Sequence, residues 1–357
     1  MIDSKSEFCQ KVLTDLSLDA FVFFELKNIR YCCGFTGSDG VYIFSPEQDW
    51  FLSDSRYTEQ ARQQVQAAHQ ICYQNKFDAV IDCLGAAKFR RIGFAADAVT
   101  VAQLQELTNR SDGQLEWVPI AEPIRSLRSC KTDAEIASLQ RAADLNALAF
   151  SEIEHLIRPG VSEQNLALEL EFALRRLGGE DRAFDFIVAS GPRGAMPHGV
   201  ASDRLLGMNE LVTFDFGTRV DGYHSDETLT IALGEVDGEL RKVFDVVLAA
   251  HDLALEHVAP GIVLADLDAV ARDYIAREGY GDYFGHGLGH GVGLDIHEYP
   301  TVSGRGLDRL QEGMVITIEP GIYLPGRGGV RIEDTVVVTA DGCRILTHLP
   351  KQFRSLV

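Results

Sequence analysis

Two aspartates in the second half of the chain lie within apolar runs and flank a strong turn signal. Between Asp215 and Asp226 stands Asp221-Gly222, a dipeptide that favours a two-residue hairpin loop. With that loop, position 228 pairs with Asp215, and the two aspartates become diagonal neighbours on one sheet face, roughly 7–8 Å apart. Two carboxylates so placed repel each other, and a shared cation would remove the cost of burying them.

A similar pattern recurs near the C-terminal end. An apolar run typical of a strand ends at Glu319, and residues 329–337 are typical of one further strand. Because side chains alternate along a strand, we expect Arg331 and Glu333 on one face and Asp334 on the other, which makes Asp334 a weaker candidate ligand. The sequence therefore offers four carboxylates, on two pairs of strands, to a single site.

A glycine-rich segment, residues 284–298, adds histidines. It contains His286, His290 and His297, and a further histidine, His198, precedes it. So much glycine excludes a stable helix, so this histidine spacing is not that of a zinc-binding helix. Four carboxylates and one imidazole would suit two divalent cations such as Mn²⁺, Co²⁺ or Zn²⁺. The isolated histidines expected to be structural or on the surface are His155, His251, His257 and His348.

The periodicity of apolar residues predicts the elements that position these side chains. In the first third, short apolar runs alternate with helical patterns, which indicates a small α/β domain. The expected strands are 20–24, 41–44, 50–52, 71–73 and 92–94, and the expected helices are 57–65, 77–84 and 101–107.

A domain boundary is expected near Pro123, which gives an N-terminal domain over 1–122 and a second domain over 123–357. Soon after it, Thr132 or Asp133 is expected to cap a helix, with Glu135 in the first turn. The long helices expected in the second domain are about 133–157, 163–177, 240–257 and 264–277. Strands fill the rest, so this domain is predicted to be α+β, and it carries the candidate site.

The composition excludes some classes of function. A net charge of −20 argues against a nucleic-acid partner, because the phosphate backbone requires a basic surface. No run of roughly 18 apolar residues could span a membrane, and the N-terminal residues lack the basic start and apolar core of a secretory signal. The seven cysteines form no CxxC pair, which is typical of reduced thiols. We therefore expect a cytoplasmic protein with no membrane or nucleic-acid partner.

Six short segments of the second domain combine the candidate residues with glycine and proline. They are Asp215-Phe216-Gly217, Ser225-Asp226, His286-Gly287-Leu288-Gly289-His290, His297-Glu298, Glu319-Pro320-Gly321-Ile322-Tyr323 and Arg331-Ile332-Glu333. Together they resemble the creatinase, prolidase and aminopeptidase P family of pita-bread metallopeptidases. The segments similar to that family's creatinase-type N-terminal domain are Asn28-Ile29-Arg30-Tyr31, Gly34-Phe35-Thr36-Gly37 and Asp54-Ser55-Arg56-Tyr57.

The resemblance implies a pita-bread catalytic domain that holds two divalent metal ions, with Mn²⁺ expected and Co²⁺ or Zn²⁺ as alternatives. Its metal ligands would be Asp215, Asp226, His290, Glu319 and Glu333. By similarity, Asp226 and Glu333 bridge the two ions. The resemblance further implies a homodimer that acts on short proline-containing peptides.

It also implies roles for residues around the ions. His198, His286 and His297 would hold the substrate and stabilise the tetrahedral intermediate, Arg331 would orient a ligand carboxylate, and Tyr323 would join the same network. We expect a hydroxide that bridges the ions to attack the scissile carbonyl, which His198 or His297 helps to polarise. Glu319 would then carry a proton to the leaving nitrogen of proline.

Three alternatives share parts of this pattern. Methionine aminopeptidases have the same ligand set but generally lack the N-terminal domain. Creatinases have both domains but do without the metal pair. Non-catalytic binding modules of this fold typically lose ligands, whereas this sequence has lost none.

One position departs from the family pattern. The family usually has Thr-Arg-Thr after the second aspartate, and this chain has Thr228-Leu229-Thr230. On a strand, Leu229 points away from the face that carries Asp226, so the metal site is expected to survive. The length of the peptide substrate is not determined by any of these motifs.

Overall fold

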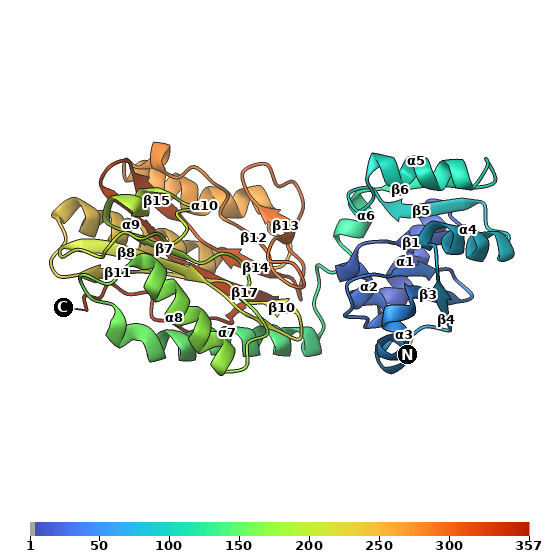
Figure 1. Ribbon diagram of the computed structural model, residues 1–357. Helices are drawn as coiled ribbons and strands as arrows, with labels where there is room; N and C mark the ends of the chain where they lie inside the picture. The colour runs from blue at the N-terminus through green and yellow to red at the C-terminus, as the bar shows by residue number, and fades with distance from the viewer. Residues whose placement is uncertain (1–3, 357) are drawn as a thin grey trace. The chain divides into compact units, whose positions relative to one another are not determined.

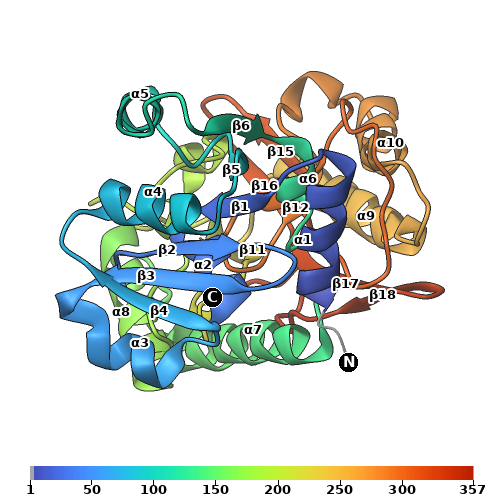
Figure 2. The same cartoon turned by 90° about the vertical axis from the view of Figure 1, so that its right-hand side faces the viewer.

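The computed structural model describes residues 4–356, and the chain divides into two compact units, Met1–Arg128 and Ser129–Val357 (Figures 1 and 2). Residues 1–3, which begin the segment where no secretory signal is expected, lie outside the described part. All seven cysteines are free thiols, as predicted.

The N-terminal unit is built on a mixed six-stranded sheet in the order β4-β3-β2-β1-β5-β6, which confirms the predicted α/β architecture. Its strands are β1 Ala20–Phe23, β2 Val41–Phe44, β3 Asp49–Asp54, β4 His69–Tyr73, β5 Arg91–Ala95 and β6 Glu116–Ile120. Its helices are α1 Ser4–Asp15, α2 Leu26–Cys33, α3 Thr58–Gln64, α4 Lys76–Ala86, α5 Val101–Arg110 and α6 Glu122–Arg125, and a 3₁₀ helix, η1, spans Ser55–Tyr57.

Some of these elements were not predicted, namely α1, α2, α6, β6 and the 3₁₀ helix η1. The α2 helix has only eight residues and is capped by Glu25, which is not one of the residues that usually mark a helix start. The β6 strand is partly exposed and contains Pro119, a residue that argues against a strand unless it lies at a sheet edge, where β6 does lie.

The second unit contains the four predicted long helices, α7 Asp133–Ile153, α8 Glu163–Arg176, α9 Gly238–His257 and α10 Leu264–Arg277, with 3₁₀ helices η2 Glu154–Leu156, η3 Gly191–Ala195 and η4 Gly281–Tyr283. Thr132 caps α7: its backbone N–H donates to the Glu135 carboxylate at 2.8 Å, and its hydroxyl accepts from the Glu135 N–H at 3.4 Å. The α7 helix ends at Ile153, earlier than predicted, because the chain tightens there into η2.

Two antiparallel sheets and two short hairpins make up the rest of this unit. The three-stranded sheet has the order β11-β8-β7, with β7 Ile187–Ser190, β8 Glu210–Phe216 and β11 Glu227–Leu233. The five-stranded sheet has the order β13-β12-β14-β17-β18, with β12 Gly289–Gly291, β13 Glu298–Val302, β14 Val315–Ile318, β17 Asp334–Thr339 and β18 Gly342–Ile345. The hairpins pair β9 Arg219–Val220 with β10 Tyr223–His224, and β15 Gly321–Leu324 with β16 Gly328–Arg331.

The four long helices cover the two sheets, and α7 contacts both of them. The helices α7 and α8 pack on the three-stranded sheet, where Phe150 meets Phe214 edge to face at 5.4 Å. The helices α9 and α10 pack on the five-stranded sheet through a second core that includes Val247, Ala271 and Ile316. This pairing of helices and sheets is the pita-bread architecture predicted from the resemblance.

The predicted hairpin register is confirmed. Both loop residues, Asp221 and Gly222, have positive φ, as a tight two-residue hairpin loop requires. Val220 pairs with Tyr223, and further along the same register Asp215 pairs with Thr228. The turn chemistry therefore sets the face on which the aspartates lie.

Between these two ladders, the backbone at Gly217 approaches the backbone at Ser225 so closely that only glycine fits at position 217. A Cβ atom there would lie 1.8 Å from the Ser225 carbonyl oxygen. We expect Gly217→Ala to destabilise the protein by about 1–3 kcal/mol, because the strands that carry both aspartates must move apart. Thermal unfolding measures the loss, and Gly238→Ala, where an added Cβ meets no atom within 4 Å, is the matched control. An unfolding midpoint of Gly217→Ala equal to that of the wild type would contradict the close approach.

The prediction of one strand over residues 329–337 is wrong. The chain leaves the β15–β16 hairpin after Arg331 and enters the five-stranded sheet at Asp334, so Ile332 and Glu333 lie between two strands of different sheets. Glu333 nevertheless remains on the side of the candidate site, where its backbone N–H donates to the Thr228 carbonyl at 3.1 Å. The break lets one segment contribute side chains to the space between the sheets.

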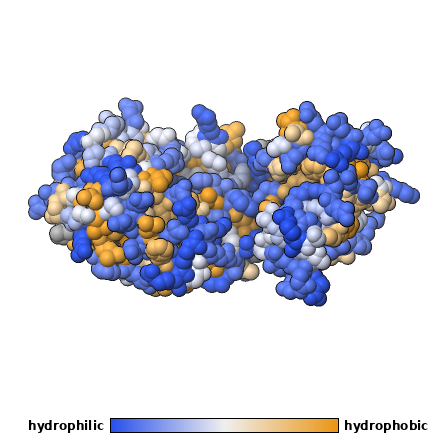
Figure 3. All heavy atoms as spheres, viewed as in Figure 1, coloured by the Kyte–Doolittle hydropathy of each residue, from blue (hydrophilic) through white to orange (hydrophobic). Residues whose placement is uncertain are grey.

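The face seen in Figure 3 is largely hydrophilic, in keeping with a chain in which 24% of residues are charged. Apolar atoms gather on this face around α8, and the exposed apolar side chains of α7 and α8 are Leu148, Leu168 and Phe172. Among the described residues, no helix has the length and apolar character needed to cross a membrane.

Candidate active site

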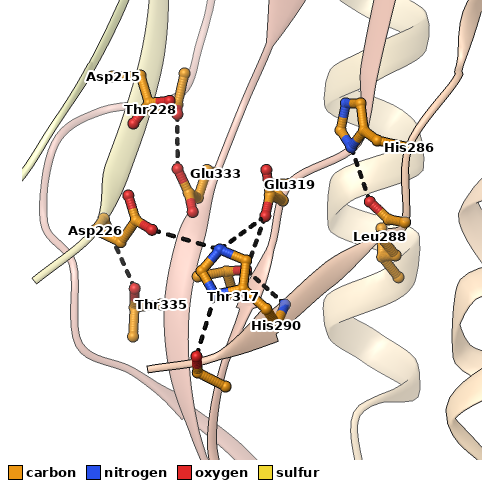
Figure 4. A network of polar contacts seen from close by, with 12 residues as sticks. Asp215, Asp226, Thr228, His286, Leu288, His290, Thr317, Glu319, Glu333 and Thr335 are labelled. Carbon is orange, nitrogen blue, oxygen red and sulfur yellow. Dashed lines mark hydrogen bonds and ion pairs between the residues drawn. The ribbon is translucent and has the colours of Figure 1, made fainter. Parts of the chain in front are cut away.

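Five side chains that are far apart in the sequence converge between the two sheets of the second unit (Figure 4). One ligand atom each from Asp226, His290 and Glu333 lies within 4.8 Å of the other two. His290 Nε2 is 3.6 Å from Asp226 Oδ2 and 3.3 Å from Glu319 Oε1. Asp215, on β8, completes the group, so all five predicted metal ligands lie in one place.

The orientation of His290 leaves one nitrogen free for a ligand. Its Nδ1 lies 3.1 Å from the Gly291 carbonyl oxygen, an acceptor, so this nitrogen carries the proton. The other nitrogen, Nε2, then faces the carboxylates of Asp226 and Glu319. A histidine held in this way by a backbone carbonyl is typical of metal ligands.

Glu319 directly follows β14 and is held by its neighbours. The Thr317 hydroxyl donates to Glu319 Oε1 at 3.1 Å and accepts from the His290 backbone N–H at 3.0 Å. Burial raises the pKa of Glu319, but the contact with His290 outweighs it and lowers that pKa to about 2. Glu319 is therefore ionised at neutral pH, whereas the same neighbourhood raises the pKa of His290 against the opposing effect of burial.

Arg331 links Asp215 to the far side of the site. Its guanidinium donates to Asp215 Oδ2 at 2.5 Å and to the Tyr323 hydroxyl at 3.0 Å, and that hydroxyl is 2.8 Å from His286 Nε2. Only 4% of Arg331 is exposed, and a third contact reaches the Pro197 carbonyl oxygen at 3.2 Å. Arg331 and Tyr323 thus belong to one hydrogen-bond network with the carboxylate of Asp215, a predicted ligand.

Asp226 and Glu333 are the two carboxyl groups whose pKa values are raised most clearly. Burial first, and then the nearby Glu333, raise the pKa of Asp226 well above its usual range. Burial, with the charges of Glu319 and Asp215, does the same to the pKa of Glu333, although the Thr228 hydroxyl donates to Glu333 Oε2 at 2.6 Å. Acidic side chains that repel each other in a buried site are well suited to share cations.

One buried atom supports the fit to metal ions directly. Asp215 Oδ2 is held by Arg331, but the second oxygen, Oδ1, is buried and has no hydrogen-bond partner within the described part of the chain. An unpartnered buried oxygen is costly unless a ligand occupies the space before it. A donor set of carboxylate oxygens and one imidazole matches borderline divalent cations.

The five side chains border a cavity of about 540 Å³. His198, His286 and His297 all line it, and the ring of His297 lies 4.3 Å from that of His290. Burial lowers the pKa of both His286 and His297, so these rings are neutral at neutral pH and can donate or accept a hydrogen bond. The predicted substrate-holding residues therefore face the same space as the predicted ligands.

Some contributors to the site were not predicted. Thr317 and Thr228 orient two of the predicted ligands, and the sequence pointed to Thr228 only as the strand partner of Asp215 and as part of the run Thr228-Leu229-Thr230. The apolar walls of the cavity are Phe184, Ile187, Val200 and Ile296, for which the sequence offers no local signal. Asp334 points away from the cavity, as expected, and instead contacts Lys351 at 3.3 Å.

Leu229, which stands where the family usually has arginine, lies in the apolar core. Leu229 is 1% exposed and packs in the apolar core between α7, α8 and the three-stranded sheet. It therefore points away from the metal ligands, as predicted, and an apolar side chain suits its surroundings in this chain.

Comparisons with known proteins agree with the geometry. Residues 137–340 match metallopeptidase family M24, and residues 7–130 match the creatinase/prolidase N-terminal domain. The chain belongs to the M24 metallopeptidases, in the branch of creatinase, prolidase and aminopeptidase P, and is a peptidase. Membership of this family implies divalent metal ions at the carboxylate and histidine cluster.

Several relatives align with this chain over nearly their full length. An uncharacterised peptidase of Bacillus subtilis, YqhT, is 42% identical over 98% of this chain and 99% of its own. A solved Xaa-Pro dipeptidase from Bacillus anthracis is 39% identical, with a TM-score of 0.96 over 99% of both chains. A solved X-Pro aminopeptidase from Thermotoga maritima is 34% identical, with a TM-score of 0.90 over 99% of this chain and 100% of its own.

Proposed function

We propose that this chain is a metal-dependent Xaa-Pro peptidase that hydrolyses peptide bonds preceding proline. Its two divalent ions, Mn²⁺ in the first instance and Co²⁺ or Zn²⁺ as alternatives, would be held by Asp215, Asp226, His290, Glu319 and Glu333. The observation that carries the proposal is the convergence of four carboxylates with His290 Nε2, together with a buried oxygen of Asp215 that lacks a partner.

The cavity and the relatives support the choice of substrate. Apolar side chains such as Phe184, Ile187 and Ile296 form part of the wall and suit the apolar ring of proline, while the ligand cluster supplies the polar part of the lining. Relatives of this chain that act on Xaa-Pro substrates include both a dipeptidase and an aminopeptidase.

When bound, two divalent ions would act as Lewis acids toward the scissile carbonyl and lower the pKa of a water molecule toward neutrality. Glu319 is ionised and can accept the proton of that water and pass it to the departing proline nitrogen. His198 and His297 line the cavity, where a ring N–H can donate to the carbonyl oxygen as negative charge develops on it. Burial raises the pKa of Asp215, and the Arg331 guanidinium opposes that rise and orients the carboxylate.

The test compares peptides that differ in one residue. Ala-Pro, Ala-Pro-Ala and Ala-Ala-Ala are offered to chelator-treated protein before and after return of Mn²⁺, Co²⁺ or Zn²⁺. We expect no activity without metal, and cleavage of a proline peptide at least about tenfold faster than that of Ala-Ala-Ala after metal return.

Each other outcome points elsewhere. Equal cleavage of Ala-Ala-Ala would indicate a general aminopeptidase. Met-Ala-Ala is offered as a fourth peptide, and a preference for it would favour the methionine aminopeptidase alternative. Absence of cleavage with every metal would favour a non-catalytic binding module. The homodimer and the cytoplasmic location expected from the sequence remain predictions, and sedimentation of the purified protein tests the first.

A further inference from the structure

A second polar cluster is buried on the reverse side of the strands that carry the two proposed bridging ligands. Glu227 directly follows Asp226, and Asp334 directly follows Glu333, so alternation turns both neighbours away from the cavity. Lys351 Nζ lies between them, 2.7 Å from Glu227 Oε1 and 3.3 Å from Asp334 Oδ1. The three side chains are almost completely buried, with exposed fractions of 7%, 0% and 7% for Lys351, Glu227 and Asp334.

The cluster lies where no ladder among the described strands pairs the two sheets. Asp226 leads into β11, at the edge of the three-stranded sheet, and Glu333 leads into β17, whose ladder partners are β14 and β18. Separate hydrogen bonds join these segments instead: the Glu333 N–H donates to the Thr228 carbonyl at 3.1 Å, the Thr228 hydroxyl to Glu333 Oε2 at 2.6 Å, and the Thr335 hydroxyl to the Asp226 carbonyl at 2.8 Å. No continuous ladder fixes the distance between Asp226 and Glu333.

The C-terminal segment, residues 346–356, spans this junction. At one end the Leu346 N–H donates to the Thr335 carbonyl on β17 at 2.9 Å, and at the other the Ala232 N–H on β11 donates to the Arg354 carbonyl at 3.0 Å. Lys351 lies between these two attachments. The Lys351 ammonium group supplies a positive charge between two acidic side chains, because Glu227 and Asp334 both contact it.

The acidic partners are themselves anchored. The Thr347 hydroxyl donates to Asp334 Oδ1 at 2.5 Å, and His251 Nε2, from α9, is 3.2 Å from Asp334 Oδ2. The Leu349 N–H donates to Glu227 Oε1 at 2.8 Å. Lys351 thus connects one strand of each sheet through two carboxylates that are immobilised by other contacts.

We propose that Lys351 is a positioning residue of the metal centre, which holds β11 and β17 at the separation that lets Asp226 and Glu333 share the same ions. This inference rests on the proposed metal site. Without the ammonium group, Glu227 and Asp334 would repel each other across the junction, and the ligands that precede them would move with their strands.

The test substitutes Lys351 by methionine, which keeps the length of the side chain and removes its charge. Manganese is titrated by calorimetry into metal-free wild-type protein and metal-free Lys351→Met at 25 °C, and circular dichroism confirms that the variant is folded. We expect the affinity for Mn²⁺ to fall about 10–100-fold, as for other residues that support metal ligands from behind.

A matched control lies three residues further along the same segment. Arg354 forms an ion pair with Glu154, and its guanidinium carbon lies 5.5 Å from the centroid of the Phe150 ring, within reach of a cation–π contact. Because neither partner adjoins a metal ligand, Arg354→Met is expected to lower the thermal midpoint and leave the affinity for Mn²⁺ unchanged. An equal loss of affinity in both variants would overturn the specific role of Lys351.

The remaining outcomes are also decisive. Wild-type affinity in folded Lys351→Met would overturn the inference. If Lys351→Met does not fold, Lys351→Gln, whose amide can donate to one carboxylate but carries no charge, is titrated instead, and wild-type affinity there overturns the inference while weakened affinity supports it. Failure of the wild-type protein to bind any divalent ion would reject the metal site itself and is distinguishable from all of these results.

Discussion

Replacing Glu333 by glutamine, or Asp226 by asparagine, is expected to abolish metal binding and peptidase activity and, at the same time, to stabilise the metal-free protein. Both carboxyl groups have pKa values raised well above the usual range, by burial first and then by neighbouring negative charges. In the absence of metal, the folded protein must therefore keep protons on groups that would ionise freely in the unfolded chain. An amide cannot ionise, so it removes this penalty along with the ligand.

The two effects differ in size. We expect activity to fall by about 10³-fold or more, which corresponds to ~4 kcal/mol of transition-state stabilisation. A gain of about 1 kcal/mol in metal-free stability would raise the thermal midpoint by roughly 2–4 °C for a domain of this size. Activity assays after Mn²⁺ return and thermal unfolding in chelator at pH 8.5 measure the two quantities.

The control makes the same chemical change on the surface. Glu256 is exposed on α9, so Glu256→Gln should alter neither activity nor stability. Binding of Mn²⁺ by Glu333→Gln with wild-type affinity would show that Glu333 is not a ligand. A lower metal-free midpoint in Glu333→Gln at pH 8.5 would show that repulsion does not oppose folding here.

Metal binding is expected to release between one and three protons near neutral pH, and its affinity should therefore rise ~10–1,000-fold per pH unit. The raised pKa values of Asp226 and Glu333, and of His290, whose pKa is raised by Glu319 in spite of burial, favour bound protons on these groups in the metal-free fold. A divalent ion can bind these groups only after the protons leave. Glu319, with a pKa of about 2, is already ionised and contributes none.

The stability of the metal-free protein should change with pH in the opposite direction. A carboxyl group with a raised pKa favours the folded state below its ordinary pKa, and this contribution is lost as pH rises through the folded-state value. The raised pKa of His290 acts in the same direction above pH ~6.5, where the unfolded side chain loses its proton. The lowered pKa of Glu319 stabilises the fold above pH ~4.3 and is lost only in acid, so it does not alter this trend between pH 6 and 9.

Calorimetric titration of Mn²⁺ in buffers with different ionisation enthalpies, from pH 6 to 8.5, counts the released protons. Thermal unfolding in chelator over the same range should show a falling midpoint. Glu333→Gln is the control titration, because it should show no specific heat of binding. Binding without proton release would mean that the cluster is already ionised in the metal-free protein.

The local parts of the fold were predictable because local chemistry determines them. Thr132 and Glu135 form a capping box that starts α7, and the Asp221-Gly222 loop sets a register that carries unchanged to the pair of Asp215 and Thr228. Elements with weak local signals were missed, such as α2, which begins at an unusual cap. Prediction over residues 329–337 failed because both strands are apolar enough to be read as one, and only packing between sheets ends the first.

The site itself was predicted as a set of residues but not as an arrangement. The alternation rule placed Arg331 and Glu333 on one side, yet it could not show that the guanidinium would reach Asp215, 116 positions earlier in the chain. The role inferred for Lys351 has no signature in its own surroundings in the sequence. Its partners, Glu227 and Asp334, lie 124 and 17 positions away and meet it only in the folded unit.

The sequence by itself determined which groups are available and on which face of each strand they stand, because turn residues and the two-residue period of a strand act over short distances. Tertiary structure alone decided how far apart those faces lie, since Asp226 and Glu333 approach through the packing of two separate sheets on two pairs of helices. Like charges do not assemble by their own attraction. The apolar cores on either side hold them together, and the capacity to bind cations results from that enforced proximity.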